Sequence, residues 1–196
     1  MAEAQHYVTL LDAGVGDRLP GGGHVIRVPR TMNAGVALRA AKDAAAAASQ
    51  QRRHLRVFCH GTHVVVAGET RSRWDMLLDL TLDDEVLEGG YGLLLGETAL
   101  SHENVDKAFG IVRGAFESIV FLACAAGHRS RTAKTGAEGD GPAFCLRAAR
   151  AANAPVYAPE ELQRLWAVGG VVAMRDWQGP VYRFTPAGVT EVVKAT

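Results

Sequence analysis

The sequence predicts a three-layer α/β domain, in which a mostly parallel central sheet is flanked by helices and carries hairpin insertions. First, apolar, strand-like runs alternate along the chain with segments of helical periodicity. Second, a strand at 24–28, a helix at about 33–51 and a strand at 54–59 form a strand–helix–strand unit, which is typical of a parallel crossover. The 196 residues suit a single domain over 1–196, with its core at about 24–158.

The first part of the chain supplies strands and a long helix. We expect an edge strand at 7–11, followed by a glycine-rich loop that runs up to Gly23. After the strand at 24–28, Thr31 or Asn33 can cap the N-terminus of the helix. The many alanines of this helix allow it to lie close to a sheet.

The middle of the chain is typical of a hairpin insertion. Residues 63–67 and 74–78 are expected to form its two arms. An acidic, exposed stretch follows at 83–88, and 91–96 is a further short apolar segment. We therefore expect this region to lie outside the parallel sheet.

A second helix is expected to begin near Ser101, which is a good N-cap residue. Val105, Phe109, Val112 and Phe116 recur at spacings of four, three and four, so they share one helical face. This helix leads directly into the next apolar strand.

The last third begins with a change of composition at 127–141, a run that has almost nothing to bury and is expected to be a loop. Pro142 suits the first turn of a helix that carries Cys145 on its apolar face, in the core. The remaining expected elements are a strand at 155–158 and a terminal hairpin, at about 170–185, made of 171–174 and 181–184.

Charge and cysteine content exclude several classes of protein. The 21 basic and 21 acidic side chains balance, so nothing favours nucleic acid or an anionic membrane as a partner. No apolar run reaches the roughly 18 residues needed to span a bilayer. Three cysteines do not make a secreted disulfide framework, and no phosphate-binding loop is present. We therefore expect a cytoplasmic protein without a membrane anchor or cofactor.

Two strand-like runs stop at reactive side chains. Residues 57–61 end in His60-Gly61, and residues 119–124 end in Cys124. If both runs are parallel strands of one sheet, both side chains emerge at its carboxyl edge, where open α/β sheets place their chemistry. A thiol is a strong nucleophile and an imidazole is a good acid or base, so the pair predicts a Cys–His site. The N–H groups of Gly61, of Cys124 and of the residues after Cys124 are candidates to hold an oxyanion.

Alternative interpretations of these residues exist. From the pattern alone, Cys124 fits the end of a buried strand about as well as a nucleophile, because unpaired cysteines are often buried. Cys59, His60 and His63 are ligand types for zinc, but adjacent strand residues point to opposite faces and no second ligand pair has the right spacing. We therefore expect no metal site.

Two acidic residues lie in the loop after Cys124. Asp140 and Glu138 are candidates to recognise a basic side chain of a substrate. Solvated loop charge is the alternative interpretation of both.

The residues quoted above resemble the caspase-like cysteine peptidases, a clan that includes caspases, metacaspases, legumain, clostripain and gingipains. The resemblance rests on His60-Gly61 after one hydrophobic strand and Ala123-Cys124 after a later one, in that order, and covers about 24–158. Residues around Cys124 differ from the caspase signature, so the chain is most similar to bacterial caspase-like proteins of unassigned substrate.

The resemblance implies a three-layer caspase-like fold and a cysteine endopeptidase that acts on a protein or peptide, with Cys124 as nucleophile and His60 as the catalytic histidine. It also implies self-processing in the loop 127–141, where the basic residues are Arg129, Arg131 and Lys134.

The alternative is a catalytically inactive caspase-like module that acts in protein–protein interaction. The acidic stretch at 83–88 and the aromatic residues Trp166 and Trp177 are its candidate interface residues.

Overall fold

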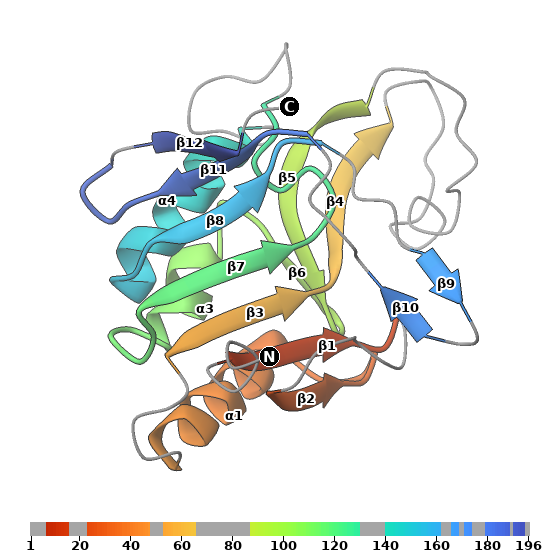
Figure 1. Ribbon diagram of the computed structural model, residues 1–196, viewed down its shortest axis with the longest axis vertical. Helices are drawn as coiled ribbons and strands as arrows, with labels where there is room; N and C mark the ends of the chain where they lie inside the picture. The colour runs from red at the N-terminus through yellow and green to blue at the C-terminus, as the bar shows by residue number, and fades with distance from the viewer. Residues whose placement is uncertain are drawn as a thin grey trace.

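The computed structural model has an α/β architecture, with one large sheet, two small sheets and three helices in the part of the chain that it describes (Figure 1). The residues described are 7–15, 23–47, 53–65, 87–129, 140–161, 166–168, 171–173, 179–188 and 190–194.

The large sheet is mixed and mostly parallel. From one edge to the other, its strands are β12 (Thr190–Lys194), β11 (Val181–Phe184), β8 (Val156–Pro159), β7 (Ser118–Leu122), β3 (His54–Phe58), β1 (Tyr7–Asp12) and β2 (His24–Val28). The five strands from β8 to β2 are parallel, whereas β11 runs antiparallel to both β8 and β12. The prediction of a mostly parallel sheet is therefore confirmed.

The first strand lies inside the sheet, so the expected edge position of 7–11 is wrong. β1 lies between β2 and β3, and β2 forms the edge. From Val8 to Asp12 every residue of β1 is buried, whereas Val25 on β2 is exposed. A strand that is buried on both faces is typical of the interior of a parallel sheet.

The three helices lie on one face of the sheet, behind it in Figure 1: α1 (Ala34–Ala47), α3 (Val105–Gly110) and α4 (Gly141–Ala152). α3 packs against both α1 and α4, and all three contribute to one apolar core. The α/β class is confirmed. The second helical layer that the sequence predicts is not seen among the described residues, whose helices cover this face only.

Local sequence explains where the longer helices start. The side chain of Asn33 accepts a hydrogen bond from the N–H of Gly35 at 2.8 Å, just before α1 begins. Asp140 caps α4 by accepting from the N–H of Ala143 at 3.1 Å, and Pro142 lies in the first turn, where no intrahelical donor is needed. The predicted cap at Asn33 and the predicted helix at Pro142 are confirmed.

The predicted apolar face before β7 is also confirmed. Val105, Phe109, Val112 and Phe116 are all buried. The helix begins at Val105, a turn later than Ser101, and ends at Gly110, after which the chain continues in turns. The ring of Phe109 packs 5.3 Å from that of Phe121 on β7, which ties the helix to the sheet.

A three-stranded antiparallel sheet branches off directly after β3. It contains β4 (His60–Val65), β5 (Leu87–Leu95) and β6 (Thr98–Leu100). An antiparallel insertion is therefore present at this point of the chain, but β4 pairs with β5, which includes residues 91–95 of the apolar segment expected at 91–96. The arm expected at 74–78 lies outside the described residues.

The C-terminal pairing differs from the prediction. Val171–Ala173 (β10) pairs with Trp166–Val168 (β9), whereas β11 pairs with β8 and β12. The predicted hairpin between 171–174 and 181–184 is therefore wrong. β11 joins the large sheet because its end residues Val181 and Phe184 are buried there.

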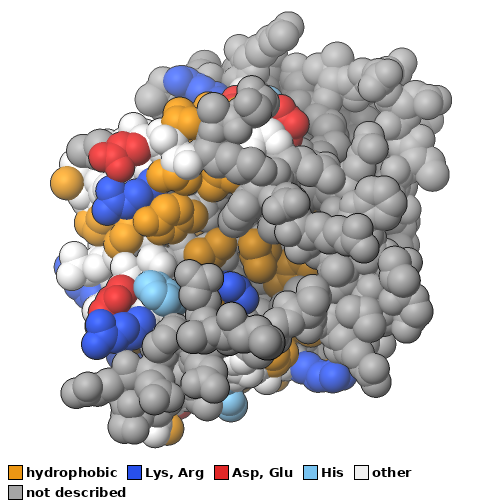
Figure 2. Space-filling model, in the orientation of Figure 1, with side chains coloured by type: hydrophobic (Ala, Val, Ile, Leu, Met, Phe, Trp, Pro, Cys, Tyr) orange, Lys and Arg blue, Asp and Glu red, His pale blue; other side chains and the backbone are white. Residues whose placement is uncertain are grey.

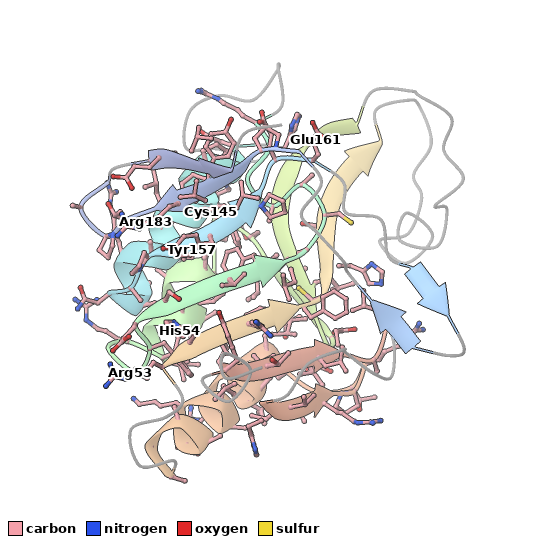
Figure 3. The ribbon with its side chains drawn as sticks, in the orientation of Figure 1. Arg53, His54, Cys145, Tyr157, Glu161 and Arg183 are labelled. Atoms are coloured by element: carbon pink, nitrogen blue, oxygen red, sulfur yellow. The ribbon has the colours of Figure 1, made fainter. Side chains whose placement is uncertain are left out.

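The sheet face opposite the helices has mixed chemistry. In Figure 2 hydrophobic side chains gather over β8 and β11, with charged side chains beside them. Tyr157 and Arg183 lie opposite each other in the register of these strands (Figure 3), and the guanidinium of Arg56 lies 3.4 Å from the centre of the Tyr7 ring. This face therefore combines aromatic and cationic groups.

Candidate active site

The two strands that lead to the candidate site residues are neighbours. β3 and β7 are parallel and in register, with Phe58 opposite Leu122. His60 and Cys124 each follow two residues later, so both leave the sheet at the same edge, where the arrows of β3 and β7 end in Figure 1. The predicted arrangement of the two strands is therefore confirmed.

Gly61 packs directly against the backbone of Cys124. A Cβ atom at position 61 would overlap the carbonyl oxygen of Cys124 and would lie 2.9 Å from its carbonyl carbon and 3.3 Å from its nitrogen. Only glycine leaves room for this approach. The His60-Gly61 motif and Cys124 therefore meet, although they lie far apart in the sequence.

The ring of His60 is held by the loop after β1. His60 is half-buried, and its Nε2 lies 3.1 Å from the carbonyl oxygen of Gly14. A carbonyl oxygen only accepts hydrogen bonds, so Nε2 carries the proton in this contact. In the neutral ring, Nδ1 is then the nitrogen that is able to accept a proton.

The turn after Cys124 is fixed by the strand beside it. Ala125 has a left-handed backbone with φ of 50°, which is unusual for a residue other than glycine, and its N–H donates to the carbonyl of Glu161 at 3.0 Å. Glu161 follows β8 and lies near the top of the sheet in Figure 3. The N–H of Gly127 donates to the carbonyl of Pro159 at 2.8 Å.

These bonds correct one expectation about the oxyanion site. The N–H of Ala125 is engaged by Glu161, so it is not a donor for an oxyanion at Cys124. Gly61 and Cys124 remain the candidate donors.

The three cysteines have different environments, and none forms a disulfide. Cys124 is half-buried, whereas Cys59 and Cys145 are 2% and 0% exposed. Burial raises the pKa of the Cys59 thiol well above its ordinary value, and the charges of Asp12 and Cys124 raise it further. Burial, followed by the charge of Asp140, also raises the pKa of Cys145. The expected core position of Cys145 is confirmed.

Asp140 is buried, and its contacts stabilise the start of α4. It is 2% exposed, caps α4 and accepts a hydrogen bond on its carbonyl oxygen from Nε2 of the buried His102, at 3.1 Å. The interpretation of Asp140 as solvated loop charge is therefore wrong, and the structure does not bring its carboxylate out to solvent at the site. Glu138 lies outside the described residues.

Asp12 is a residue of this edge that the sequence analysis missed. It ends β1, is 4% exposed, and its carboxylate accepts hydrogen bonds from the N–H groups of Gly14 and Gly96. The signal was present, because the strand-like run at 7–11 stops at a polar side chain just as the runs before His60 and Cys124 do.

In the described ranges, no three side chains of His, Cys, Asp or Glu lie close enough together to hold a metal ion. None of the helices described is both long and apolar enough to cross a bilayer.

Comparisons with known proteins do not assign a family. No family model matches the chain, and no curated protein or solved structure matches it.

Proposed function

We propose that the chain is a caspase-like cysteine endopeptidase in which Cys124 is the nucleophile and His60 is the acid and base. The observation that carries the proposal is the parallel, in-register pairing of β3 with β7, which brings both motifs to one edge. The packing of Gly61 on the backbone of Cys124 supports it, because the two motifs are in contact.

The chemistry follows from the hydrogen bonds at this edge. The Cys124 thiol transfers its proton to Nδ1 of His60, since Nε2 is engaged by Gly14, and the thiolate attacks the peptide carbonyl carbon. The N–H groups of Gly61 and Cys124 stabilise the resulting oxyanion. His60 then gives the proton to the departing amine, and water hydrolyses the thioester to regenerate the thiol.

A peptide library tests the proposal, with cleavage products identified by mass spectrometry. The wild-type chain should cleave a subset of peptides, Cys124→Ala should not, and His60→Ala should be slower by about 10²–10⁴-fold. His24→Ala removes the same type of side chain from the edge strand β2, away from the proposed chemistry, and should retain cleavage. Equal cleavage by Cys124→Ala and by the wild type would show that Cys124 is not the nucleophile.

The second candidate function is a non-catalytic module that binds a protein partner. One observation favours it: Val192 and Val193, on the edge strand β12, are 57% and 48% exposed. Of its expected interface residues, Trp177 and most of 83–88 lie outside the described residues. A chain that cleaves no library peptide but binds a protein through β12 would favour this function.

A further inference from the structure

A third strand ends at the proposed active-site edge and carries a buried carboxylate. Asp12 is the last residue of β1, which pairs with β3 in parallel up to Leu11 opposite Phe58. Its side chain accepts from the N–H of Gly14 at 2.7 Å and from the N–H of Gly96 at 2.6 Å. Both donors are neutral backbone groups. A carboxylate is costly to bury, so these two short hydrogen bonds indicate a site where its position matters.

The carboxylate determines the shape of the loop that holds His60. Oδ1 of Asp12 binds the N–H of Gly14, and the carbonyl of the same glycine accepts from Nε2 of His60 at 3.1 Å. The backbone N–H of Val15 returns to the carbonyl of Asp12 at 3.1 Å, which closes a tight turn. Gly14 is therefore fixed on one side by Asp12 and contacts the imidazole on the other.

The space around Gly14 shows how closely these groups are packed. A Cβ atom there would lie 2.9 Å from Oδ1 of Asp12, 3.3 Å from Cδ2 of His60 and 3.4 Å from its Nε2. The second bond of the carboxylate, to Gly96, ties the same turn to the turn between β5 and β6. Movement of the carboxylate would therefore be transmitted to the ring through one residue.

We infer that Asp12 is a positioning residue for His60, which holds the imidazole with Nε2 protonated and Nδ1 available through the Gly14 carbonyl. This inference rests on the proposed function for its catalytic meaning, although the orientation of the ring is measurable without any substrate. A misplacement of about 1 Å in a catalytic group costs about 10²-fold in rate, so a second residue that fixes the ring has a measurable effect.

The variant Asp12→Asn tests the inference, because it is nearly the same size but has only one acceptor oxygen for the two N–H groups. The protonation of the His60 nitrogens is read from a long-range ¹H–¹⁵N spectrum of the imidazole groups, with His60→Ala to assign the signals. In the wild type, Nε2 should carry the proton. In Asp12→Asn, His60 should exchange between both tautomers.

The activity readout is the split between kcat and KM. Asp12→Asn should lower kcat by about 10–100-fold and leave KM within about threefold, because the substrate does not contact a carboxylate that is 4% exposed. The matched control is Asp106→Asn, an exposed carboxylate paired with Arg147, which should change neither the His60 spectrum nor kcat.

A second variant keeps the inference testable if Asp12→Asn does not fold. Gly14→Ala retains the carboxylate but places a Cβ between it and the ring, so it should alter the His60 spectrum in the same way. If both variants fold, their effects on kcat should be less than multiplicative in the double variant, since they act through one contact.

The outcomes separate the inference from the proposed function. A His60 spectrum and kcat that stay unchanged in folded Asp12→Asn, or a change in KM alone, overturn the positioning role. If the spectrum changes as expected but the wild type cleaves no peptide, Asp12 does position the ring and the peptidase function fails.

Discussion

At the scale of single residues, contact between the two motifs depends on the absence of one side chain. Gly61 lies where any Cβ would overlap the carbonyl oxygen of Cys124. The adjacent Ala125 adopts a left-handed backbone that non-glycine residues rarely adopt. Tight packing on one side of Cys124 and a constrained backbone on the other together define the position of its peptide unit.

The substitution Gly61→Ala should therefore displace Cys124. We expect it to lower the free energy of unfolding by about 1–3 kcal/mol, the usual cost of overpacking, and to slow modification of the Cys124 thiol. Thermal denaturation and iodoacetamide labelling measure the two effects. Gly110→Ala is the control, because nothing lies within 4 Å of a Cβ there. In α3 it should stabilise the helix by up to about 1 kcal/mol. Wild-type stability and labelling in Gly61→Ala would contradict the packing argument.

Thiol reactivity should distinguish the three cysteines. Burial raises the pKa of Cys59 and of Cys145, so at neutral pH these thiols are both inaccessible and protonated, whereas Cys124 is half-buried. Iodoacetamide should therefore label one site in the folded protein, at Cys124, and three sites in denaturant. Peptide mapping by mass spectrometry identifies the sites. Equal labelling of all three thiols, or of none, in the folded protein would count against the site.

At the scale of whole elements, the sequence predicts best where local patterning and burial agree. Three such predictions rest on local signals, and the structure confirms them. They are the apolar runs that form β3 and β7, the helix that starts near Pro142 and the apolar face of α3. Because parallel strands of an open α/β sheet place their chemistry at its carboxyl edge, the sequence also predicted that His60 and Cys124 lie at one edge, although the strand order was not known.

The errors arose where partners far apart in the sequence decide the structure. The insertion of β1 between β2 and β3, and the pairing of β11 with β8 instead of β10, are set by which faces become buried. The role of Asp12 was missed for the same reason. Its hydrogen-bond partner Gly96 lies on a distant turn, whose proximity the strand pattern does not encode.

Self-processing in the loop 127–141 should cut the chain beyond Arg129 and not at Arg129 itself. The backbone of Arg129 forms a β-bridge with that of Asp140, and a residue held in this way is a poor cleavage site. We expect prolonged incubation to give two fragments by intact mass, cut after Arg131 or Lys134. Cys124→Ala should remain whole. A wild-type chain that also remains whole would contradict self-processing, and a cut after Arg129 would contradict the protection by the β-bridge.

At the scale of the whole molecule, the large sheet ends in two different edges. β2 closes one side with Val25 and Arg27 exposed, and β12 closes the other. Val192 and Val193 are adjacent on β12, so they point to opposite faces of the strand, and both are exposed. Edge strands of soluble proteins usually carry charge or other features that prevent pairing with another chain. β12 also carries Glu191, but its two valines place apolar side chains on both faces of this edge, which makes it a candidate site for added strands.

The valines of β12 should accordingly promote self-association through strand pairing. We expect Val192→Lys to raise the concentration at which the protein associates by at least about tenfold, which corresponds to about 1.4 kcal/mol of association free energy. At a concentration where the wild type contains dimer, the variant should therefore have a lower sedimentation coefficient. Val36→Lys is a closely matched control, because Val36 is 56% exposed compared with 57% for Val192 but lies on α1, whose backbone hydrogen bonds are satisfied within the helix. Analytical ultracentrifugation over a range of concentrations measures the difference. Equal effects of the two substitutions would show that exposed apolar area, and not the open strand edge, drives association. A wild-type chain that is monomeric at every concentration would contradict the prediction of self-association.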